Sequence, residues 1–221
     1  MNKEVRLFRG LTNPTFFFYQ LKDMEIVTGY RKEVFSLLLL SIFVFGLISS
    51  FGIGMDPLSK EITTLSPFTY ELEKFLFFLG RLLGGLLYGA IVLFFCSLIF
   101  WTISNEGAFR KLVMIQGVVL IVLLLEQITY IPLSLFFSLE WYSSPLSLGV
   151  ITQYATSNTY IIYLMGSFSL FKAWVFFIQY KGIKRLTSQK NWIIWLVILL
   201  TNVFIWALNA LLAYLSISTL I

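Results

Sequence analysis

Long apolar runs alternate with short polar segments along the whole chain. Five of these runs are long enough to cross a bilayer, whose hydrocarbon core is about 30 Å thick and needs about 20 helical residues. They cover residues 34–55, 75–103, 112–139, 160–180 and 192–221. The runs are continuously apolar and do not alternate residue by residue, which favours helices over the strands of a β-barrel. The pattern predicts an all-α fold, a polytopic membrane bundle of five transmembrane helices.

The chain divides near residue 33 into a basic, aromatic N-terminal segment (1–33) and a transmembrane domain (34–221). Within the N-terminal segment, Asn13 followed by Pro14 predicts a helix start, because Asn caps helices and Pro suits the first helical position. Phe17, Phe18 and Leu21 give this short helix an apolar face. It is expected to lie on the membrane interface as an amphipathic helix. The alternative is that the same side chains pack under the bundle.

The cations outside the runs are unevenly distributed among the connecting segments. Twelve Lys and Arg residues lie in the N-terminal segment and in the second and fourth loops, whereas two lie in the first loop. Residues 140–159, the third loop, carry none. Cytoplasmic segments of membrane proteins are enriched in such cations. This distribution predicts a cytoplasmic N-terminus, an extracytoplasmic C-terminus and a location in the plasma membrane.

Composition excludes a soluble protein. Hydrophobic residues make up 58% of the 221 residues and charged residues 12%. Soluble domains have about 45–50% apolar and about 25% charged residues, so this surplus exceeds what one core of this length hides. The net charge is +5. The placement of the positive charges in the loops indicates the orientation in the membrane, and no nucleic-acid partner is expected. Membrane lipids are the expected surroundings.

The residue inventory argues against an enzyme. The chain has no His and one cysteine, Cys96, which excludes histidine-based nucleophile systems, disulfide frameworks and the HExxH zinc sites. No Asp lies in any apolar run, and there is no phosphate-binding P-loop. We therefore expect no catalytic, metal-binding or cofactor-binding residues.

Three ionisable residues lie within the runs: Arg81, Glu126 and Lys172. Charges at membrane depth cost about 2.5–3.5 kcal/mol each even on insertion scales, so each needs a partner or a function. Their depths along the runs favour a buried pair between Arg81 and Glu126. Lys172 either extends toward the cytoplasm or is itself the partner of Glu126.

Amide side chains recur along three runs. Gln116 and Gln127 lie in the third run, and Asn202 and Asn209 lie one heptad apart in the fifth. Gln179 extends the polar pattern of the fourth run. These stripes are expected to face one another inside the bundle. Such contacts often serve only to hold helices together; the functional alternative is a path for an ion or small solute.

Four glycines in the second run form two small-xxx-small patterns, Gly80 with Gly84 and Gly85 with Gly89. Glycines at this spacing let helix backbones approach closely. The first explanation is packing within the bundle. The second is docking of a partner's helix, or of a second copy of this chain in a homo-oligomer.

Three segments resemble the bacterial form of the Ypt-interacting-protein (Yip) family. They are residues 7–14 with Phe17, Phe18, Leu21 and Lys22, residues 106–112 with Gln116-Gly117 and Ile131-Pro132, and residues 171–174 with 182–186. The Asp-Leu-Tyr-Gly-Pro signature of eukaryotic members is missing, so a role in vesicle traffic is not transferred. The resemblance implies five spans and no catalytic residues.

The resemblance also implies a protein that works by contact. Bacterial members look like accessory subunits, some of them linked to ABC-type exporters. We therefore expect a non-enzymatic membrane subunit that binds and regulates or stabilises another membrane complex, with an ABC-type exporter as the candidate partner. The alternative is a transporter or channel for an ion or small solute that uses the intramembrane charged and amide residues.

Overall fold

A computed structural model describes residues 7–24, 29–55, 59, 66–104 and 108–215. These residues form helices joined by short loops. Four helical stretches are long and apolar enough to cross a membrane: α3 (Tyr30–Ser50), the continuous stretch Pro67–Trp101, α7 (Phe109–Phe137) and α11 (Asn191–Tyr214). They coincide with the first, second, third and fifth predicted runs. The architecture is that of a helical membrane protein.

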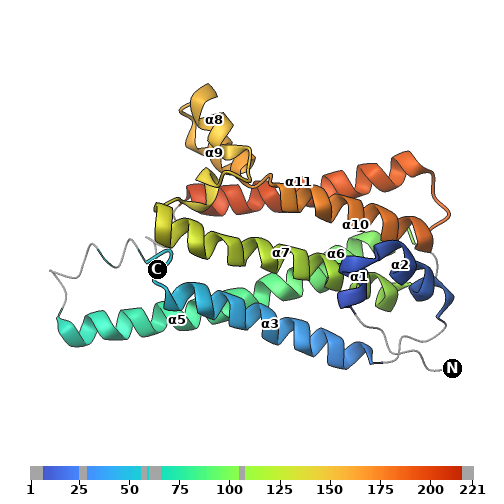
Figure 1. The fold of residues 1–221 in the computed structure, drawn as a ribbon, viewed down its shortest axis with the longest axis horizontal. Coiled ribbons are helices and arrows are strands. Elements are labelled where there is room, and N and C mark those ends of the chain that lie inside the picture. The colour runs from blue at the N-terminus through green and yellow to red at the C-terminus, as the bar shows by residue number, and fades with distance from the viewer. Residues whose placement is uncertain (1–6, 25–28, 56–58, 60–65, 105–107, 216–221) are drawn as a thin grey trace.

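The stretch Pro67–Trp101 consists of α5 (Pro67–Ala90), the π-helical turn η1 (Ile91–Phe95) and α6 (Cys96–Trp101). Its 35 residues correspond to about 52 Å of helix, well beyond the roughly 30 Å of a bilayer core. Figure 1 shows the start of α5 extending past the rest of the bundle.

The fourth predicted run, residues 160–180, does not form one helix. It is divided between α9 (Thr159–Gly166) and α10 (Leu170–Leu186). Ser169 is extended (φ −123°, ψ 168°), and its Oγ accepts a hydrogen bond from the backbone N–H of Lys172. This N-cap starts a new helix inside the apolar run, so the prediction of a continuous fourth span is wrong. α10 has 17 residues.

Helix α7 lies at the centre of the bundle (Figure 1). It touches α3 on one side and α10 on the other, while α5 packs on α3 and α11 packs on α10. In the most apolar part of α7, 78% of residues are buried, against 33%, 33% and 28% in the other three long helices. The core is therefore built around α7.

The N-terminal segment packs onto this core. It forms α1 (Phe8–Thr12) and α2 (Pro14–Asp23), with the predicted Asn13 cap accepting from the N–H of Phe16. Phe17, Phe18 and Leu21 are at most 4% exposed, because α2 packs against α10 and α7. They fill the core, as the alternative for this segment expected.

Helices α3, α7 and α11 begin at one end of the bundle, where α6 and α10 end (Figure 1). We call this the basic end, because the cations flanking these helix ends, among them Arg31, Lys32, Arg110 and Arg185, gather there. The sorting of loops by charge therefore matches the way the described helices run.

The opposite end carries a smaller substructure. It comprises the 3-10 turn η2 (Trp141–Ser143), α8 (Gly149–Ala155) and α9, which stand across the direction of the long helices (Figure 1). A Cβ atom at Gly149 would lie 1.9 Å from the carbonyl oxygen of Tyr142, and one at Gly166 would lie 2.8 Å from Tyr142 Cβ. Only residues without a side chain allow this close approach, which seats α8 and α9 on η2.

Candidate functional site

A buried ion pair lies where the fourth run is interrupted. Glu126 on α7 is 1% exposed, and Lys172 on α10 approaches both of its carboxylate oxygens. The distances from Lys172 Nζ are 3.3 Å to Oε2 and 3.4 Å to Oε1. Lys172 was the alternative partner for Glu126.

Hydroxyl groups complete the surroundings of the carboxylate. Ser169 Oγ and Tyr130 OH both donate to Glu126 Oε1, the latter at 3.1 Å. Glu126 Oε2 is buried and accepts no hydrogen bond from the described residues, although the lysine ammonium lies beside it. Oε1 thus accepts hydrogen bonds from two hydroxyl groups, whereas Oε2 interacts only electrostatically with the Lys172 ammonium group.

The helix interruption positions the lysine. Lys172 Nζ donates to the carbonyl oxygen of Ser167, 2.9 Å away, which is free because α9 ends there. The interruption is held by the preceding loop, since the N–H of Leu148 donates to Phe168 O and that of Leu170 donates to Leu146 O. The backbone groups of the interruption are thereby satisfied, as buried backbone polar groups require.

A second polar layer crosses the bundle nearer its basic end. Asn202 on α11 donates to Gln179 Oε1 on α10 at 2.8 Å, and Gln179 donates to Gln116 Oε1 on α7 at 3.4 Å. All three side chains are buried, and Gln116 Nε2 has no partner among the described residues. The predicted contact between amide side chains inside the bundle is therefore confirmed for these three residues. Gln127 is half-buried and Asn209 is exposed.

Arg81 lies apart from both layers, and the expected Arg81–Glu126 pair does not form. Its guanidinium carbon is 5.9 Å from the ring centres of Phe45 and Phe77, and its Nε is buried without a partner in the described structure. The reason is rotational, since Arg81 faces α3 while Glu126 faces α10. Depth along a run does not reveal this difference.

The two glycine patterns of α5 differ in their surroundings. Gly85 and Gly89 are buried against α3, where added Cβ atoms would lie 2.9 Å from Ser41 O and 3.1 Å from Leu38 Cδ2. Added Cβ atoms at Gly80 and Gly84 would meet nothing within 4 Å. One pair thus serves packing within the bundle, and the other lies open beside it.

An exposed row of leucines runs along α5, with Gly80 beside it. We call it the leucine seam, and it consists of Leu72, Leu76, Leu79, Leu83 and Leu86, which are between 37% and 61% exposed. Their spacing alternates four and three residues, which is the heptad pattern of helices that pack along a partner helix. On α5 this seam faces away from α3.

Comparison with protein-family models, with curated proteins and with solved structures finds no match. The resemblance to the Yip family therefore remains an expectation carried by the residues quoted for it.

The polar layers join α7, α10 and α11 into one unit by charge and hydrogen bonds, while α3 and α5 are joined by close backbone packing. The sequence interpretation missed Tyr130 and the carbonyl of Ser167. Tyr130 was detectable as the residue one helical turn after Glu126. The interruption was signalled by Ser169, three residues before Lys172, in the place of a helix cap.

Proposed function

We propose that this chain is a non-enzymatic membrane protein that works by contact, binding another membrane complex along the outer side of α5 and regulating or stabilising it. The observation that carries the proposal is the leucine seam with Gly80 beside it. A row of apolar side chains beside exposed backbone is the surface that another transmembrane helix packs against.

The geometry of α5 adds to this proposal. The helix extends past the bundle, and its first turns carry Phe68, which is 80% exposed, together with Glu71 and Lys74. Charged residues mark this part as lying outside the hydrocarbon, where an exposed phenylalanine has no lipid to contact. A partner that covers the seam would also cover Phe68.

The proposal includes an orientation and a partner class. Placing the basic end in the cytoplasm gives a cytoplasmic N-terminus and an extracytoplasmic C-terminus in the plasma membrane, in keeping with the enrichment of cations in cytoplasmic segments. The resemblance to bacterial Yip proteins suggests an ABC-type exporter as the partner. A second copy of this chain is the competing occupant of the seam.

Substituting Gly80 with leucine is expected to reduce partner capture about tenfold, because the new side chain fills the place where a partner backbone would approach. The measurement is affinity isolation of the tagged chain from its native membranes in mild detergent, with quantitative mass spectrometry of what accompanies it. The matched control is Val203→Phe on exposed α11, which adds bulk to the far flank and should leave capture unchanged. Equal capture by both variants, or a clean monomer from the unmodified chain, would contradict the proposal.

A second candidate function is supported by the Glu126–Lys172 pair. Interrupted helices that expose backbone carbonyls and charged side chains at membrane depth are how many secondary transporters hold their cargo. The chain would then carry a cation or a small charged solute past α7 and α10.

For this second function, Glu126→Gln is expected to abolish cation flux into liposomes while preserving a monodisperse protein, because glutamine still accepts hydrogen bonds from Ser169 and Tyr130 but has lost the charge. Glu71→Gln on the exposed start of α5 is the matched control and should retain full flux. If the unmodified chain gives no more flux than empty liposomes, the transport function is rejected.

A further inference from the structure

An open pocket of about 570 Å³ lies at the basic end and is separate from the polar layers and from the leucine seam. Its walls are Gly29, Tyr30, Arg31, Lys32 and Arg110. These residues come from the starts of two helices, α3 and α7, which are distant in sequence. A pocket of this volume is large enough for a lipid headgroup.

The electrostatics of the pocket favour an anion. Three of the five lining residues that the structure describes are cations, and none of those five is a carboxylate. Within the described part of the chain, no side chain caps the start of α3 at Gly29 or of α7 at Ala108. Uncapped helix starts add positive potential to that of the three side chains.

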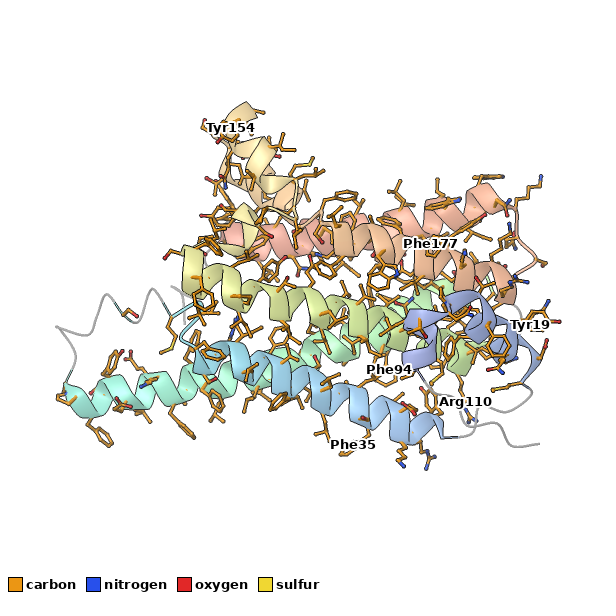
Figure 2. The ribbon with its side chains drawn as sticks, in the orientation of Figure 1. Tyr19, Phe35, Phe94, Arg110, Tyr154 and Phe177 are labelled. Atoms are coloured by element: carbon orange, nitrogen blue, oxygen red, sulfur yellow. The ribbon has the colours of Figure 1, made fainter. Side chains whose placement is uncertain are left out.

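An apolar strip runs along the outer side of α3, beyond Arg31. Phe35, Leu39 and Phe43 are 64%, 49% and 64% exposed and follow Arg31 at intervals of four residues, so they lie on one side of the helix. Figure 2 shows Phe35 on the outer side of α3 and Arg110 close to where that helix begins. Arg31, which lines the pocket, is thus followed along α3 by an exposed apolar track.

We infer that this surface binds an anionic phospholipid, with the phosphate in the pocket between α3 and α7 and one acyl chain along Phe35, Leu39 and Phe43. The three cations supply charge complementarity, and basic pockets between transmembrane helices are the usual headgroup sites. The apolar strip is what distinguishes a lipid from a free phosphate, because a soluble anion has no use for it. The inference is independent of what docks on α5.

The test is native mass spectrometry of the detergent-purified full chain, with phosphatidylglycerol and phosphatidylcholine of identical acyl chains added in equal amounts. The unmodified protein is expected to retain phosphatidylglycerol preferentially. Removing one cation should reduce that preference about fivefold, so the triple variant Arg31→Gln/Lys32→Gln/Arg110→Gln should reduce it about a hundredfold. The single variant Arg110→Gln gives the smaller loss if the triple variant fails to fold.

A charge-matched control removes three other exposed cations of the basic end, Lys184, Arg185 and Lys190, each replaced by Gln. This control should keep the preference, because those residues lie on α10 and just before α11 and not in the pocket. An equal loss in both triple variants would show general attraction to the basic end and overturn the inference.

A second arm distinguishes the lipid from a soluble anion. Phe35→Ala should weaken retention of phosphatidylglycerol, and glycerol 3-phosphate at millimolar concentration should not displace the lipid. Full displacement by glycerol 3-phosphate, together with no effect of Phe35→Ala, would assign the pocket to a free phosphate compound and overturn the inference.

Discussion

Replacing Lys172 with methionine is expected to destabilise the protein by about 3–5 kcal/mol, the usual cost of leaving a buried charge without its partner. Glu126 would keep its hydrogen bonds from Ser169 and Tyr130, but its second oxygen, which accepts no hydrogen bond from the described residues, would lose the ammonium group beside it. Methionine matches the lysine stem in length, so the loss reports the missing charge and not a cavity. Unfolding in mixed micelles with increasing SDS, followed by tryptophan fluorescence, measures the change.

Two comparisons isolate the buried pair. The double variant Glu126→Gln/Lys172→Met should recover stability to within about 1 kcal/mol of the unmodified chain, because no uncompensated charge remains. Lys74→Met breaks the exposed pair with Glu71, whose side chains are 51% and 68% exposed, and should cost about 1 kcal/mol or less. Similar losses for Lys172→Met and Lys74→Met would mean that the buried pair is no more important than a surface one.

The second large effect is expected at Gly85, where leucine should cost about 3 kcal/mol. The first added carbon would already lie 2.9 Å from the carbonyl oxygen of Ser41 and 3.1 Å from the Cα of Ile42. These are backbone atoms, so a change of side-chain rotamer gives no relief and α5 must move away from α3. That movement would also break the hydrogen bond from Ser41 Oγ to the carbonyl oxygen of Gly85, which measures 2.6 Å.

The neighbouring glycine provides the control. Gly84→Leu makes the same chemical change one residue away, where an added Cβ meets nothing within 4 Å, and it should change stability by less than about 1 kcal/mol. The same SDS titration compares the two variants. Equal behaviour of Gly84→Leu and Gly85→Leu would contradict the packing of α5 on α3 described above.

Much of the fold could be predicted from the sequence, because continuous apolar runs of sufficient length form helices in a membrane whatever their neighbours. The amide contacts of Gln116, Gln179 and Asn202 could also be predicted, because buried amide side chains on adjacent helices form hydrogen bonds with one another. Asn209 shows the limit of that reasoning. A heptad spacing on a helix does not ensure equal burial, since Asn202 is buried and Ala210 fully buried while Asn209 is exposed.

The sequence favours Arg81 over Lys172 as the partner of Glu126, but the correct choice depends on which helix lies beside which, and at what rotation. A hydropathy run gives the depth of a residue but not its direction around the helix. The interruption of the fourth run was not predicted either. Its backbone is held in place by residues 140–159, and the composition of that loop does not indicate this role.

The short, lysine-bearing α10 has a consequence for how the chain enters a membrane. Taken alone, it is a poor candidate for insertion, with only 17 residues and a lysine whose transfer to mid-membrane costs about 2.5–3.5 kcal/mol. Glu126 precedes Lys172 by 46 residues, so during synthesis the carboxylate on α7 is made before the lysine emerges. The order of the two residues along the chain therefore means that the counterion of Lys172 has already been synthesised when α10 is made.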